Sequence, residues 1–166
     1  MTTDRDEEPD SALYFDGSND NFTFDVQQQL TANFSFSFWA KPEQSTVMGT
    51  EATSGTQMFN GSPHNALLYA AHGGSPRAGF GITLGTNGFN VTHYGSALAP
   101  ASLAYATPLS EWNHFIVLST NNRASFYLNG LFVKQGLQFP EPLFTGAGMM
   151  VVASDTWNSD VNCGFH

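Results

Sequence analysis

Acidic and amide side chains gather in two short segments of the chain that could bind a cation. The longer segment runs from Asp155 to Asn162, and its side-chain oxygens include those of Asp155, Asn158 and Asp160. Calcium prefers six to eight hard oxygen ligands, usually supplied by loops. The sequence therefore predicts a candidate calcium site at Asp155, Asn158 and Asp160.

The second candidate metal segment places Asp16 and Asp20 on either side of a glycine-containing turn. These two carboxylates could contribute ligands to the same cation. They are also ordinary turn residues, because aspartate side chains commonly accept hydrogen bonds from nearby backbone N–H groups. Both interpretations stay open from the residues alone.

Trp157 lies inside the polar segment that also carries Asp155 and Asn158. An exposed indole can stack on a sugar ring or anchor a peptide, while polar neighbours bond the ligand. The alternative is that the ring folds back over the edge of the domain. Trp157 and Asn158 are therefore candidate ligand-binding residues, together with His72, His93 and the turn residue Asn87.

The sequence contains no residue pattern typical of a catalytic site. After the first ten residues acidic side chains are sparse, and no two alternate along a predicted strand as a two-carboxylate glycosidase requires. Cys163 and the scattered histidines form no nucleophile triad or zinc motif. His114 lies within an apolar segment and is expected to pack there with a satisfied ring. The sequence predicts that the protein is not an enzyme.

The composition limits the class of protein that can position these residues. The chain has 166 residues, with 41% hydrophobic and 14% aromatic residues but only 11% charged ones. Such a chain can bury a core, so it is neither disordered nor a coiled coil. A net charge of −9 excludes electrostatic binding of nucleic acid. No apolar run is long enough to span a membrane or to form a signal peptide.

Much of the negative charge lies at the N-terminus, where five carboxylates fall within the first ten residues. We interpret residues 1–11 as an acidic, solvated and flexible leader, and residues 12–166 as a single domain. Cys163 is the only cysteine, which leaves the redox compartment undetermined.

The apolar residues of the domain repeat with a period of two, which is typical of strands with one apolar face. Alternating runs begin at Phe22, Phe34, Phe80 and Phe89, and turn signals separate them. Asn129-Gly130 predicts a tight type I′ hairpin, because both residues accept a positive φ. Residues 112–120 are apolar at most positions after His114, which predicts a central strand covered on both faces. The expected fold is all-β, a sandwich of two antiparallel sheets.

Four sequence blocks resemble the laminin G-like domains of the concanavalin A-like jelly-roll group. They are Ala12–Asp20 (ALYFDGSND), Asn33–Pro42 (NFSFSFWAKP), Glu111–Phe115 (EWNHF) and Phe126–Val133 (FYLNGLFV). The resemblance implies an extracellular or cell-surface recognition or adhesion module that binds glycan or protein ligands, often with calcium. It also places Trp39 and Trp112 at core positions. A structural or assembly subunit that packs against other proteins is the alternative, and a glycoside hydrolase is the least supported one.

The sequence departs from the family pattern at its C-terminal end. Members usually close with a strand that lies beside the first one, whereas this sequence stops at His166. The resemblance therefore predicts that Leu13–Phe15 forms a first strand without its usual partner. The chain could be incomplete, its own leader or C-terminal loop could cover the edge, or another polypeptide could donate the strand. We expect incompleteness or strand donation rather than self-coverage.

Overall fold

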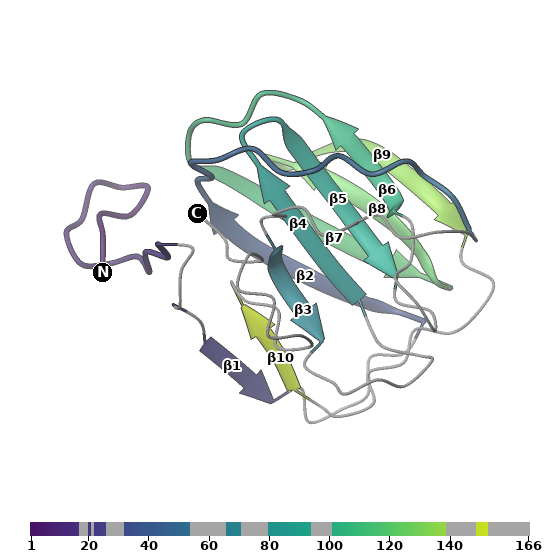
Figure 1. Ribbon diagram of the computed structural model, residues 1–166, viewed down its shortest axis with the longest axis horizontal. Coiled ribbons are helices and arrows are strands. Elements are labelled where there is room, and N and C mark those ends of the chain that lie inside the picture. Colours follow the sequence, from purple (N-terminus) through teal and green to yellow (C-terminus); the bar gives the residue numbers. More distant parts are fainter. Residues whose placement is uncertain are drawn as a thin grey trace.

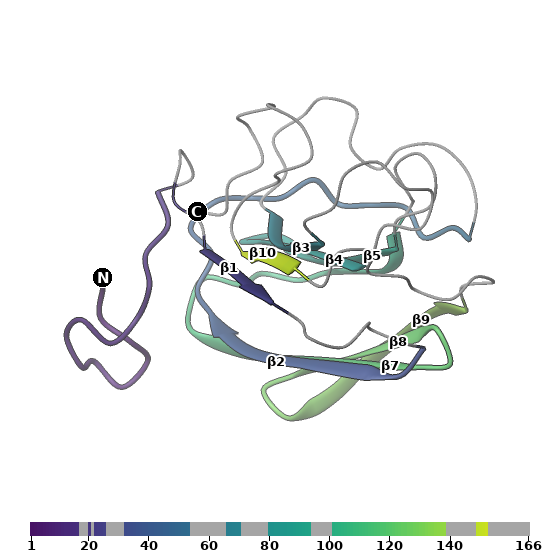
Figure 2. The same ribbon diagram turned by 90° about the horizontal axis from the view of Figure 1, so that it is seen from below.

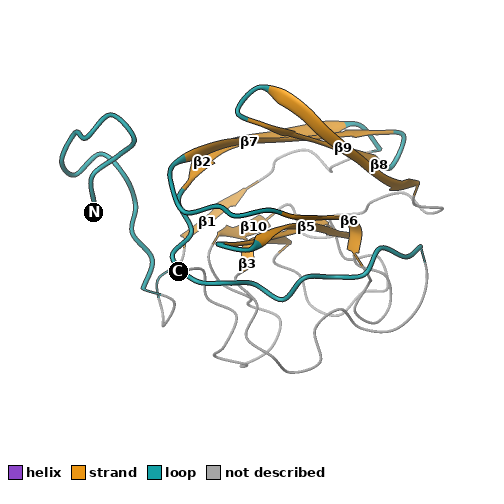
Figure 3. Ribbon diagram, turned by 90° about the horizontal axis from the view of Figure 1, so that it is seen from above, coloured by secondary structure: helices purple, strands orange, loops and turns teal. Residues whose placement is uncertain are grey.

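A computed structural model describes residues 1–16, 20, 22–25, 32–53, 66–70, 80–93, 101–138 and 149–152. Among these residues there are ten β-strands and no helix. Figure 3 shows the strands as two layers facing each other. The predicted all-β sandwich of two antiparallel sheets is confirmed.

Each sheet combines strands that are distant in the sequence. The larger has the order β1 (Phe22–Asp25), β10 (Met149–Val152), β3 (Ala66–Ala70), β4 (Phe80–Gly85), β5 (Gly88–His93) and β6 (Ala101–Ala106). The smaller has the order β2 (Phe34–Ala40), β7 (Asn113–Thr120), β8 (Arg123–Leu128) and β9 (Leu131–Gln138). All neighbouring strands within the two sheets run antiparallel. Figure 2 shows the sandwich edge-on, with the four-stranded sheet below.

Alternation along β2 sets which side chains enter the core. Phe34, Phe36 and Phe38 pack against the buried cluster, while Ser35 and Ser37 are exposed. The faces of this strand are therefore as the sequence predicts. Continuous pairing with β7, from Phe34 opposite Ser119 to Ala40 opposite Asn113, keeps this alternation in register.

Three fully buried phenylalanines join the two sheets at the centre of the core. Phe89 comes from the six-stranded sheet, and Phe115 and Phe126 come from the four-stranded one. The Phe89 and Phe126 ring centroids lie 4.4 Å apart, and those of Phe89 and Phe115 lie 5.8 Å apart. These aromatic contacts span the gap between the layers, as expected for a sandwich core.

Two tight turns connect the strands of the four-stranded sheet. Asn129 and Gly130 have φ angles of 51° and 80°, which confirms the predicted type I′ hairpin between β8 and β9. Asn121 and Asn122 turn β7 into β8 with φ angles of 50° and 61°. The Asn129 side chain accepts a hydrogen bond of 2.8 Å from the His114 backbone N–H, which fastens the hairpin to β7.

A segment of irregular backbone, residues 44–52, crosses the outer face of the six-stranded sheet; we call it the strap. Figure 1 shows it as the dark blue trace that runs over β4, β5 and β6. Asn87 holds it in the manner of a backbone pair: its Oδ1 accepts from the Thr46 N–H at 2.8 Å, and its Nδ2 donates to the Thr46 carbonyl at 2.9 Å. Asn90 does the same with the Gly49 N–H and the Val47 carbonyl, at 3.0 and 2.9 Å.

The strap also joins the two sheets at one edge of the sandwich. The Lys134 ammonium of β9 lies 2.7 Å from the Glu51 carboxylate of the strap and donates to the Ala104 carbonyl at 3.0 Å. The same carboxylate accepts from the Ala104 N–H at 2.7 Å. Since both side chains are partly shielded from water, this charge-assisted network fixes β6, β9 and the strap together.

Two fold predictions need correction. β7 is a central strand, but only one of its faces is covered: Leu118 is 38% exposed and Thr120 is exposed. Figure 2 shows no described segment beneath this sheet apart from the leader at its edge. The first strand is Phe22–Asp25 rather than Leu13–Phe15, and it pairs with β10, the last strand that the structure describes.

Candidate recognition site

The first twelve residues form a closed hairpin, which we call the leader hairpin. Thr2 and Ala12 exchange two backbone hydrogen bonds of 2.9 and 3.1 Å. Between them, the Asp4 carboxylate accepts from the Asp6 and Glu8 N–H groups at 2.8 and 3.1 Å. Asp4 thus acts as a local turn residue, in the way that aspartate commonly organises turns. The sequence predicts a solvated leader, and the structure shows a defined turn at this place.

The leader hairpin ends next to Leu13–Phe15, the segment for which the sequence predicts an open edge; what pairs with that edge stays a prediction. Its Thr2 pairs with Ala12, so contact at the start of this segment comes from the same chain. Leu13 and Tyr14 are 56% and 50% exposed, whereas Phe15 packs against the core. These three residues are not part of a sheet; they form one wall of a pocket.

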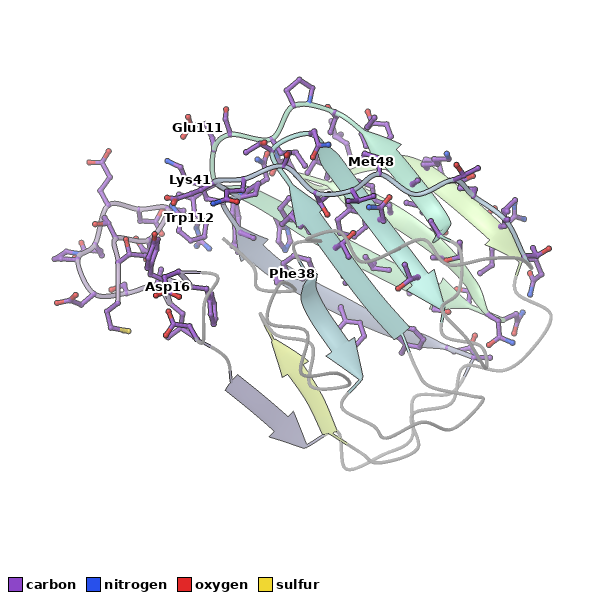
Figure 4. All side chains as sticks on the ribbon, viewed as in Figure 1. Asp16, Phe38, Lys41, Met48, Glu111 and Trp112 are labelled. Carbon is purple, nitrogen blue, oxygen red and sulfur yellow. The ribbon has the colours of Figure 1, made fainter. Side chains whose placement is uncertain are left out.

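A pocket of about 490 Å³ lies between the leader hairpin and the end of the sandwich. Figure 4 shows Lys41, Glu111 and Trp112 together at this end of the molecule. The lining residues come from the leader hairpin, the following segment and two loops: Thr2, Thr3, Asp4, Arg5, Glu7, Leu13, Tyr14, Phe15, Lys41, Glu43, Glu111 and Trp112. The wall thus combines aromatic rings with hydroxyl and charged groups.

The polar groups of the pocket are partly paired with one another. The Lys41 ammonium lies 3.4 Å from the Glu111 carboxylate, and both side chains are well exposed. Exposed pairs of this kind contribute little to stability. Their charged atoms can therefore exchange this contact for hydrogen bonds to a polar ligand at small cost.

Beside the pocket, Trp39 presents its ring on the outer face of the four-stranded sheet. It is 43% exposed, so the prediction that it is buried is wrong. It lies opposite His114 in the ladder, and the two rings stack with centroids 5.0 Å apart. His114 Nε2 shares a hydrogen bond of 2.8 Å with Ser37 Oγ, which confirms the predicted packing of a satisfied histidine. Trp112, also predicted to be buried, is only partly so.

The guanidinium of Arg5 reaches from the leader hairpin to this ring. Its central carbon lies 4.4 Å from the centroid of Trp39. Within the leader hairpin, the same side chain forms an exposed ion pair with Asp6 at 3.4 Å. Arg5 thus belongs both to the pocket lining and to the Trp39 surface.

The predicted site residues that the structure describes do not form one site. Asn87 holds the strap with both atoms of its amide, and His93 ends β5, where only its backbone is described. The Asp20 carboxylate accepts a hydrogen bond of 3.1 Å from the Asp16 N–H, so this turn uses the backbone bonding that the sequence left open. His72, Asp155, Trp157, Asn158 and Asp160 lie outside the described residues.

Metal ligands do not gather in the part of the chain that the structure describes. There, no group of three or more histidine, cysteine, aspartate or glutamate side chains is placed to hold an ion. Likewise, none of the described residues forms a helix long and apolar enough to cross a membrane.

Sequence reasoning missed the pocket and the exposed Trp39. The pocket depends on contact between the leader hairpin and two loops, at Lys41–Glu43 and at Glu111–Trp112, that are distant in the sequence, which no local pattern encodes. For Trp39 a signal was present: it follows Ser35 and Ser37 at the same period of two and so belongs to their polar face.

Among solved structures, two with similar folds come from botulinum neurotoxins. Type C, whose cell entry depends on two ganglioside molecules, matches with a TM-score of 0.55 and 13% identity over 83% of this chain and 33% of that one. The receptor binding domain of type G matches with a TM-score of 0.53 and 12% identity over 89% of this chain and 38% of that one. The chain therefore spans less than half of either structure. At this identity the likeness shows the fold alone.

Comparison with curated proteins finds no match. The family comparison, in contrast, extends over nearly the whole domain, from the segment after Phe15 to the C-terminal residues. Because the laminin G model matches residues 16–164, the chain belongs to the concanavalin A-like lectin/glucanases superfamily.

Proposed function

We propose that this domain is a non-catalytic recognition module that binds a glycan in the pocket between the leader hairpin and the sandwich. The observation that carries this proposal is the composition of the pocket wall. Tyr14 and Trp112 offer ring faces for stacking on a sugar, and Lys41, Glu43 and Glu111 offer donors and acceptors for its hydroxyl groups.

The structural neighbours are consistent with a glycan as the ligand. The type C neurotoxin interacts with gangliosides, and the matching part of type G is a receptor binding domain. Fold alone does not choose a ligand, so this support is by analogy. An extracellular or cell-surface location belongs to the same proposal.

The absence of catalysis is supported by the distribution of acidic residues. Of the ten described strands, only β1 contains a carboxyl group, that of Asp25. A glycosidase of the two-carboxylate type needs a pair of carboxyl groups that flank the scissile bond. Such a pair cannot be assembled on any single strand that the structure describes.

The test is a glycan array followed by titration of the best ligand against matched variants. Tyr14→Ala removes an exposed ring from the pocket and should weaken binding at least tenfold, roughly the effect of losing one ring–sugar contact. Tyr127→Ala, on the outer face of β8, is the control and should bind normally. If Trp157→Ala abolishes binding while Tyr14→Ala does not, the site is the loop predicted from the sequence instead.

Calcium at Asp155, Asn158 and Asp160 is proposed as an accessory to this function. The same titration in the presence of a chelator tests it, together with the melting temperature. A bound ion should raise the melting temperature by mass action, and excess calcium should restore what the chelator removes. An unchanged melt and unchanged binding would rule out a calcium requirement.

The alternative function is protein–protein packing, which is supported by a different surface of the domain. Leu131 and Phe132, at the tip of the β8–β9 hairpin, are 73% and 59% exposed. Large apolar side chains are enriched at protein interfaces. Sizing chromatography that shows an oligomer, lost on Phe132→Ser, together with an empty glycan array, would favour this function.

A further inference from the structure

We propose that the Trp39–His114 stack is a binding site for the guanidinium group of an arginine displayed on a polypeptide, and that Arg5 fills it in the same chain. The proposal rests on the occupant that the structure shows there. The Arg5 guanidinium carbon lies 4.4 Å from the Trp39 ring centroid, well within the distance for a cation–π contact.

The platform is held in place by contacts that do not involve Arg5. Trp39 and His114 are cross-strand partners on β2 and β7, and their rings stack at an interplanar angle of 18°. Ser37 fixes the His114 ring through a 2.8 Å hydrogen bond, and Asn129 fixes its backbone N–H. A platform that is already ordered loses little side-chain freedom on binding, which favours the bound state.

The surface chemistry fits an arginine better than other side chains. Tryptophan is the best aromatic partner for a cation, and a planar guanidinium can stack on an indole as well as attract it electrostatically. Trp39 remains 43% exposed with Arg5 in place, so a ligand in solution can reach the ring.

The leader hairpin is suited to present this arginine and to release it. Arg5 is the only basic residue before Lys41 and stands among five carboxylates. The hairpin is closed by its own hydrogen bonds, between Thr2 and Ala12 and around Asp4, so its shape does not depend on the Trp39 contact. A single exposed cation–π contact is weak, so an arginine from another chain can compete with Arg5. Arg5 also lines the pocket, but its contact with Trp39 and the test of that contact do not require the pocket to bind a glycan.

The experiment titrates N-acetyl-arginine amide into the full chain and into its Arg5→Ala variant, and follows the Trp39 indole N–H by nuclear magnetic resonance. N-acetyl-citrulline amide, which has a similar shape without the charge, is the matched probe. Trp39→Phe assigns the signal, and Arg123→Ala, which removes another exposed arginine, is the control variant.

We expect Arg5→Ala, but not Arg123→Ala, to move the Trp39 signal in the absence of any probe. The arginine probe should then shift this signal at a concentration roughly two- to fivefold lower in Arg5→Ala than in the unmodified chain, the factor that one exposed cation–π contact provides. The citrulline probe should leave it in place. The proposal is overturned if the arginine probe acts equally on both chains, if citrulline acts as strongly, or if neither moves the signal.

Discussion

At the scale of single residues, the buried side-chain amide of Asn90 joins the strap to the six-stranded sheet through hydrogen bonds. It is fully buried, and it bonds the Gly49 N–H, the Val47 carbonyl and the Thr83 hydroxyl. From the sequence alone, Asn90 is only one of the polar positions in an alternating strand. The partners could not be predicted, because the strap lies some forty residues away and has no periodicity of its own.

Two substitutions, one in the strap and one in the strand beneath it, should therefore change the free energy of unfolding in opposite directions. Asn90→Ala should lower the free energy of unfolding by about 2–4 kcal/mol, because it removes hydrogen bonds to the buried Thr83 hydroxyl and to two partly buried backbone groups of the strap. Thr46→Val should raise it by up to about 1 kcal/mol, because the Thr46 hydroxyl is buried without a hydrogen-bond partner among the described residues. Urea denaturation measures both. A loss on Thr46→Val would mean that its hydroxyl is satisfied after all.

At the scale of elements, patterning predicted the strands with regular alternation and missed those without it. β2, β4, β5 and the β8–β9 hairpin were all expected, because polar or small residues alternate with apolar ones along them. In β2 the polar positions are exposed, whereas Thr83 of β4 and Asn90 of β5 are buried on the face that the strap crosses. β3, β6 and β10 were not expected. β6 reads ASLAYA and is buried from Ala101 to Leu103 irrespective of polarity, because the strap and the core cover it from both sides. Such strands carry no alternation to detect.

Two glycines of the β8–β9 hairpin should respond differently to alanine. Gly130 has a φ of +80° with open space around its Cβ position, so Gly130→Ala should cost about 1 kcal/mol through backbone strain alone. At Gly136, a Cβ would lie 2.3 Å from the Ser102 carbonyl oxygen of β6, so Gly136→Ala should cost more than about 2 kcal/mol. Thermal unfolding of both variants compares them. Equal losses would mean that β9 can move away from β6.

At the scale of the whole molecule, the two sheets depend on one aromatic centre. Phe126→Ala should lower the free energy of unfolding by about 3–5 kcal/mol, because it removes a fully buried ring that contacts Phe89 across the layers. Chemical denaturation gives the value. Phe132→Ala, on the exposed side of the same sheet, is the control and should change stability by less than about 1 kcal/mol. A small loss of unfolding free energy in Phe126→Ala would mean that the centre of the core lies elsewhere.

The pocket, unlike the fold, could not be predicted from the sequence. The fold follows from local alternation and from four motifs. The pocket instead arises where Tyr14, Lys41 and Trp112 meet, and only the packing of distant segments brings them together. Trp39 is exposed because no described segment crosses that face of the sheet, a property of the assembled sandwich rather than of the strand.

The amide pairing of Asn87 with the strap has a consequence for the chemical ageing of the protein. Asn87 precedes Gly88, and an asparagine before glycine is prone to lose its side-chain amide to water through a cyclic imide. In the resulting carboxylate an oxygen replaces Nδ2, which now donates a hydrogen bond of 2.9 Å to the Thr46 carbonyl. Because an ionised carboxylate has no proton to donate, this hydrogen bond would be lost. Stored protein would then lose this fastening of the strap while its sheets stayed intact. Asn129-Gly130, which anchors the β8–β9 turn to His114, carries the same liability.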